Sequence, residues 1–125
     1  MNGATEARMT PLPEEGHLLR IFIGESDKQD GMPLFEWIVQ QARQHGLAGA
    51  TVLRGITGFG AHSRIHSAKI LQLSEDLPIV IEIVDSQDKI DAFVPVLDGM
   101  MSSGLVTLEK VQVLQYGKPK SVGST

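Results

Sequence analysis

The sequence predicts an α+β fold of the ferredoxin-like type, in which two helices cover one face of a four-stranded antiparallel sheet. Segments whose apolar residues alternate with a period of two are interleaved with segments whose apolar residues recur every three or four positions. Their order along the chain is β-α-β-β-α-β, which is the split βαβ pattern. The 125 residues, 42% of them hydrophobic, are enough for one domain with a substantial core.

The first β-α unit follows a lead-in over residues 1–16, which has no apolar period and is expected to be flexible. Residues 17–23 alternate around Leu19 and Ile21, which predicts a strand. A turn-rich connection over 24–32 leads to Pro33, a residue suited to the first position of a helix. Apolar residues then recur at spacing four until Gly46 ends the helix.

Two further strands are expected in the middle of the chain. Residues 50–57 are rich in β-branched side chains, and residues 79–84 form an almost continuous apolar run that only Glu82 interrupts. Residues 69–73 are a candidate second arm of a hairpin. The long connection between the two strands exceeds what a hairpin needs, and such loops often carry function.

A second helix and a last strand complete the pattern. Asp85 or Ser86 is a suitable N-cap, and apolar residues follow at helical spacing up to Leu97. Pro95 lies inside this helix, where it removes one backbone hydrogen bond. Residues 106–116 alternate as a strand, and 118–125 form a polar tail that is expected to be flexible. The folded domain is thus predicted over residues 17–117.

Two helices can cover only one face of this sheet. The other face is predicted to carry apolar side chains together with one pair of opposite charges on adjacent central strands. Its expected members are Arg20, Phe22, Val80, Glu82 and Val84. An apolar surface of this kind usually marks an association site, so we expect a homo-oligomer packed through it.

The loop after the second strand contains Gly55, Gly58 and Gly60 in the pattern G-x-x-G-x-G. This is not the G-x-G-x-x-G dinucleotide fingerprint, and the chain has no phosphate-binding P-loop motif. The glycines either form a bulged strand end or allow close approach of a ligand. His62 and His66, at spacing four in the same loop, could contribute to a metal site, although no third ligand has an obvious spacing.

Composition excludes several function classes. The net charge of −4 and the lack of a basic block argue against nucleic-acid binding. There is no cysteine, and no apolar run approaches the length of a membrane span. No arrangement of acids, histidines and hydroxyls suggests catalysis, so we expect a cytoplasmic binding protein with no enzymatic activity and no certain cofactor.

Three stretches of the sequence resemble a known family. They are Gly-Leu-Ala-Gly-Ala-Thr-Val-Leu-Arg-Gly-Ile-Thr-Gly-Phe-Gly-Ala-His-Ser from residue 46, Asp-Leu-Pro-Ile-Val-Ile-Glu-Ile-Val-Asp from residue 76, and Gly-Leu-Val-Thr-Leu-Glu from residue 104. Over about residues 18–116 the chain resembles the PII-like proteins of domain of unknown function 190. Gly46, Gly49 and Thr51, followed by Gly-Phe-Gly at residue 58, also resemble the PII signal-transduction family more distantly.

The resemblance implies a ferredoxin-like homotrimer that binds a small ligand, with adenine nucleotides as candidates, in clefts between subunits. It places the ligand at the base of a mobile T-loop, before the last strand and after it. The matching residues here are Gly58, Phe59, Gly60, Ala61, His62, Gly104 and Lys118. The loop beyond, with Arg64 and His66, is expected to engage a partner protein.

Two features of the resemblance leave the ligand open. The Gly-Lys that binds phosphate in PII proteins is absent before the last strand of this chain, so triphosphate binding does not carry over. The alternative interpretation is a trimeric protein of the same fold that binds a divalent metal through His62 and His66.

Overall fold

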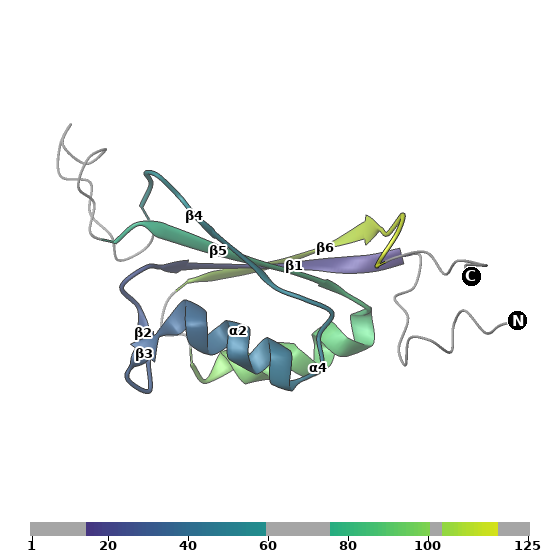
Figure 1. The fold of residues 1–125 in the computed structure, drawn as a ribbon, viewed down its shortest axis with the longest axis horizontal. Helices are drawn as coiled ribbons and strands as arrows, with labels where there is room; N and C mark the ends of the chain where they lie inside the picture. The colour runs from purple at the N-terminus through teal and green to yellow at the C-terminus, as the bar shows by residue number, and fades with distance from the viewer. Residues whose placement is uncertain (1–14, 60–75, 101–103, 118–125) are drawn as a thin grey trace, which may run out of the picture.

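A computed structural model describes residues 15–59, 76–100 and 104–117. The elements are β1 (Glu15–Gly24), β2 (Lys28–Gln29), β3 (Met32–Pro33), α2 (Leu34–Gln44), β4 (Thr51–Arg54), β5 (Pro78–Asp85), α4 (Gln87–Asp98) and β6 (Leu105–Gln112). The four long strands form one antiparallel sheet in the order β4-β5-β1-β6, and β2 pairs with β3 in a small hairpin. Both helices lie on the same side of the sheet (Figure 1). The predicted α+β class and strand order are therefore confirmed.

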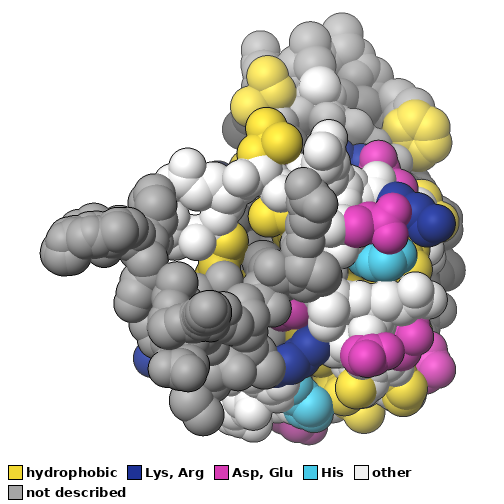
Figure 2. Space-filling model, turned by 90° about the vertical axis from the view of Figure 1, so that its right-hand side faces the viewer, with side chains coloured by type: hydrophobic (Ala, Val, Ile, Leu, Met, Phe, Trp, Pro, Cys, Tyr) yellow, Lys and Arg dark blue, Asp and Glu magenta, His cyan; other side chains and the backbone are white. Residues whose placement is uncertain are grey.

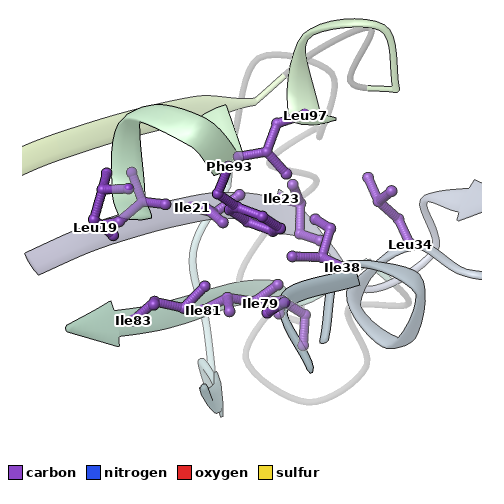
Figure 3. Close-up of a cluster of buried hydrophobic side chains, with 12 residues drawn as sticks. Leu19, Ile21, Ile23, Leu34, Ile38, Ile79, Ile81, Ile83, Phe93 and Leu97 are labelled. Carbon is purple, nitrogen blue, oxygen red and sulfur yellow. The ribbon is translucent and has the colours of Figure 1, made fainter. Parts of the chain in front are cut away.

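The core forms between the two helices and the covered face of the sheet. On β1 and β5 every second residue is buried, which gives two rows of aliphatic side chains. The helices contribute residues at spacings of three and four, and Phe93 of α4 projects into the middle of the cluster (Figure 3). The buried hydrophobic residues are Leu19, Ile21, Ile23, Leu34, Ile38, Ala42, Ile79, Ile81, Ile83, Ile90, Phe93 and Leu97.

The ends of both helices agree with the chemistry of their residues. Gly46 follows α2 with φ of 76°, a conformation that glycine adopts without steric cost. Ser86 caps α4, and its side-chain oxygen accepts a hydrogen bond from the backbone N–H of Lys89 at 3.3 Å. Pro95 lies inside α4 on its exposed side, where water can solvate the carbonyl that loses its partner.

Several boundaries differ from the sequence-based ones. β1 starts at Glu15, before the predicted start, and the expected connection over 24–32 includes the β2–β3 hairpin. Pro33 is the N-cap of α2 and also the last residue of β3. β6 ends at Gln112, so the prediction of a strand to residue 116 was wrong. The candidate hairpin arm at 69–73 lies outside the described residues.

Candidate ligand-binding site

The uncovered face of the sheet is ordered in cross-strand rows. One row is apolar and runs across all four strands. Its members are Leu53, Val80, Phe22 and Leu105. The next row is polar and consists of Thr51, Glu82, Arg20 and Thr107. The face predicted from alternation is therefore present, with Leu53 and Leu105 as outer members that the sequence did not identify.

Arg20 joins three strands through two ion pairs. Its Nε lies 3.0 Å from Oε2 of Glu82 on β5, and its Nη1 lies 3.0 Å from Oε1 of Glu109 on β6. The side-chain hydrogen bond with Glu82 is the main cause that raises the pKa of Arg20, with smaller charge effects from Glu109 and Glu82 in the same direction. The guanidinium is therefore a fixed positive charge, and the predicted pairing of Arg20 with Glu82 is confirmed.

A hollow lies where this face meets the end of the sheet. Its volume is about 620 Å³, within the range of about 300 to 1,000 Å³ that is typical of small-molecule sites. Leu18, Glu82 and Val84 come from the uncovered face, and the two walls are residues 48–51 and 111–116. Thr51, Gln112, Gln115 and Tyr116 add donors and acceptors around a partly apolar surface.

The first wall follows α2 and is held from several sides. Asp85 is buried, and its two oxygens accept hydrogen bonds from the backbone N–H groups of Ala48 at 2.8 Å and Ser86 at 2.7 Å. Lys89 Nζ donates to the carbonyl of Gly46 at 3.1 Å. Asp85 was expected to serve as a turn or cap residue. In the structure Ser86 is the cap, and Asp85 fastens the wall of the hollow to the start of α4.

The predicted glycine group lies elsewhere. The backbone N–H of Gly55 donates to the carbonyl of Pro78 at 2.8 Å, and Gly58, with φ of 146°, lies against the same proline ring. Gly104, with φ of 130°, precedes β6 at this end of the sheet. Pro78 is at the start of β5 and the hollow is near its end, so one chain does not bring Gly58, Phe59 and Gly104 into the hollow.

Other predicted site residues cannot be placed. Gly60, Ala61, His62, Arg64, His66 and Lys118 lie outside the described residues. Among the residues that are described, no group of three or more His, Cys, Asp or Glu side chains is arranged to hold a metal ion. The histidine-based metal site therefore stays a prediction.

Sequence reasoning missed most of the residues that line the hollow. Thr51 and Glu82 are neighbours only through the β4–β5 register, and residues 112–116 join them from the far end of the chain. The alternation of β5 did place Glu82 and Val84 on the uncovered face. No local pattern in residues 112–116 indicated that they would form a wall.

The surface around this end of the molecule is mixed in charge. In Figure 2, which views the right-hand end of Figure 1, acidic side chains lie beside basic ones and beside histidines on the coloured surface. A mixed surface gives no broad positive field of the kind that attracts a polyanion. Among the described helices, none has the length and apolar character needed to cross a membrane.

This architecture, two helices on a four-stranded sheet with an uncovered face and a hollow at its end, is that of a PII-like protein with a ferredoxin-type fold. CPII from Thiomonas intermedia K12, solved with ADP and bicarbonate, matches with a TM-score of 0.59 and 19% identity over 79% of this chain and 88% of that one. CPII solved with ADP, AMP and acetate matches with a TM-score of 0.58 and 16% identity over 81% and 90%. A putative PII-like signalling protein from Thermus thermophilus, TTHA0516, gives 0.55 and 18% over 79% and 89%.

The chain belongs to the DUF190 family, described as "Uncharacterized ACR", whose model matches residues 16–113. A UPF0166 protein of Aquifex aeolicus is 41% identical over 97 residues, which is 78% of this chain and 91% of the relative. The UPF0166 protein MJ1524 of Methanocaldococcus jannaschii is 32% identical over 97 residues, 77% of this chain and 89% of the relative. The resemblance to this family and to PII-like proteins is thus confirmed.

Proposed function

We propose that this protein is a PII-like regulatory protein that binds an adenine nucleotide in clefts between the subunits of a homotrimer. The observation that carries the proposal is the ligand-sized hollow at the edge of an uncovered, partly apolar sheet face. In this proposal the segment over residues 60–75 engages a partner protein, and nucleotide binding controls that contact. The protein acts by binding, without catalysis, in the cytoplasm.

The lining of the hollow suits the parts of a nucleotide. Leu18 and Val84 offer apolar surface to a planar base, and Thr51, Gln112 and Gln115 offer hydrogen bonds to a ribose or to base edges. None of the described lining residues is a lysine or arginine, which favours a nucleotide with few phosphates. That relatives of similar fold have been solved with ADP and AMP supports this ligand class.

A trimer would bring the two candidate regions together. Within one chain, the hollow and the group formed by Gly58, Phe59 and Gly104 lie at opposite ends of the sheet. A neighbouring copy that packs on the apolar row of the uncovered face can place its own end beside the hollow. The cleft between subunits would then contain residues from both regions, as the resemblance to PII proteins implies.

Two glycine substitutions test the hollow as the ligand site. A Cβ added at Gly49, in the wall, or at Gly99, after α4, meets no atom within 4 Å, so both positions accept a side chain without a clash. Gly49→Leu should fill the hollow and Gly99→Leu should not. We expect calorimetry with ADP and AMP to show binding to the wild type and to Gly99→Leu and a loss of at least tenfold in affinity for Gly49→Leu.

The same experiment separates the alternatives. Light scattering of each variant controls for loss of assembly. Equal affinity in the two variants would reject the hollow as the site. If neither nucleotide binds the wild type, but zinc does and His62→Ala with His66→Ala abolishes that binding, the metal-binding alternative replaces the proposal.

A further inference from the structure

Both backbone polar groups of Ala48 are bound by side chains from distant parts of the chain. Its N–H donates to Oδ2 of Asp85 at 2.8 Å, and its carbonyl accepts a hydrogen bond from the hydroxyl of Tyr116 at 3.1 Å. Asp85 is 5% exposed and Tyr116 is 40% exposed. This one residue in the wall is therefore fixed from the inside by a buried carboxylate and from the outside by a surface phenol.

The outer bond joins the two walls of the hollow. Ala48 belongs to the wall that follows α2, and Tyr116 belongs to the wall formed by the chain after β6. Beyond Gln112 this second wall has left the β-ladder, although Val113 still lies beside Gly16 of β1. The hydrogen bond of Tyr116 therefore fastens a segment that the sheet does not hold.

The two bonds differ in strength. Asp85 binds two backbone N–H groups through charge-assisted hydrogen bonds in a buried position, and such bonds are about twice as strong as neutral ones. The bond of Tyr116 is neutral, longer and partly exposed to water, which competes for the same groups. When the wall opens, the tyrosine bond should break first while Asp85 keeps Ala48 in place.

We propose that Tyr116 is a latch that positions the C-terminal wall against Ala48 and limits the exchange of ligand in the hollow. This inference rests on the proposed nucleotide site. Opening of the latch separates residues 113–116 from residues 48–51, and closing places both walls around the ligand. Asp85 is the fixed part of the device, and Tyr116 is the part that moves.

The test replaces Tyr116 with phenylalanine, which keeps the ring and removes only the hydroxyl. The dissociation rate of a fluorescent ADP analogue should rise roughly two- to tenfold, the factor that corresponds to one neutral hydrogen bond. Thr107→Val is the matched control, because it also removes a hydroxyl from an exposed residue but does not line the hollow. An unchanged dissociation rate in a folded Tyr116→Phe protein that still binds ADP would overturn the latch.

A second measurement does not need the nucleotide. Tyr116 is the only tyrosine of the chain, so fluorotyrosine gives a single ¹⁹F signal that reports its surroundings. Amide hydrogen exchange at residues 49–50 and 113–117 should be faster in Tyr116→Phe than in the wild type, while the Ala48 amide stays protected by Asp85. If ADP does not bind but this exchange increases, the proposed function fails and the latch stands. Equal exchange in both proteins would reject the latch.

Discussion

Arg20 and Glu82 face each other across the two central strands of the sheet, with Nε of Arg20 3.0 Å from Oε2 of Glu82. The pair lies between the apolar row of the uncovered face and the hollow, and Glu82 also lines the hollow. In a single chain both side chains are about one-third exposed. Packing of a second copy on this face would remove them from water together, so the pair links assembly to the ligand site.

We expect the protein to be a trimer that depends on the apolar row. Leu53→Asp places a charge in that row, whereas Ile56→Asp makes the same type of change at a more exposed apolar residue outside it. Burial of an unpaired charge at an interface is costly, so Leu53→Asp should dissociate the assembly and Ile56→Asp should not. Light scattering of dilute protein measures both, and a wild-type monomer would contradict the prediction.

Replacement of Glu82 should destabilise the assembly more than replacement of Glu109. Glu82 is the less exposed partner of Arg20 and bonds its Nε, while Glu109 lies on the edge strand and is 57% exposed. Loss of Glu82 in an assembled interface leaves the guanidinium without its main partner. The melting temperature of Glu82→Gln should fall further than that of Glu109→Gln, and equal melting temperatures would argue against a buried pair.

The pH dependence of this effect follows from the direction of the shift. Because the pKa of Arg20 is raised in the folded state, its contribution is fully present below the pKa of an unfolded arginine. It is lost only when the pH rises through the higher folded value. The difference between wild type and Glu82→Gln should therefore persist from neutral to mildly alkaline pH, as thermal melts in a pH series would measure.

Phe93 should be the most sensitive position of the core. It is fully buried, projects between the sheet and α2, and meets the ring of His45 edge to face at 5.7 Å between centroids (Figure 3). Phe93→Ala should lower the free energy of unfolding by about 3 to 5 kcal/mol, since it leaves a cavity as well as losing burial. Phe93→Leu should cost less. Denaturant unfolding of the two variants, with Pro95→Ala on the exposed side of α4 as a surface control, measures the difference.

The periodic elements could be predicted from the sequence, because each buries one face and local spacing records it. Leu34, Ile38 and Ala42 recur at spacing four, and the isoleucines of β5 recur at spacing two. The pairing of Arg20 with Glu82 followed from the same alternation. Its second partner, Glu109, could not be found in this way, because the register of β6 against β1 leaves no local signal.

The hollow was not predictable for a related reason. Its walls join residues 48–51 to residues 111–116, and the tie between them is a single bond from Tyr116 to a backbone carbonyl, which has no sequence signature. Periodicity extended the last strand to residue 116, although pairing stops at Gln112. The glycine pattern at residue 55 did mark a real constraint, but its structural partner is Pro78.

The last prediction concerns Gly58, where a side chain meets two obstacles. Its φ of 146° is rarely adopted by other residues, and an added Cβ would lie 3.1 Å from Cγ of Pro78. Gly31, with φ of 80°, has only the first obstacle, because a Cβ there meets no atom within 4 Å. Gly58→Val should therefore shift the chain where it leaves β4, and Gly31→Val should strain only the β2–β3 turn.

If the cleft between subunits uses Gly58 as proposed, Gly58→Val should abolish ADP binding in calorimetry while light scattering still finds the trimer. Gly31→Val should lose stability of order 1 to 3 kcal/mol, the usual cost of such a backbone conformation, and keep its affinity. Arg64→Ala should retain most of the affinity for ADP but weaken capture of a protein partner. Unchanged ADP affinity in a trimeric Gly58→Val would assign Gly58 to the structure of the strand end and remove it from the ligand site.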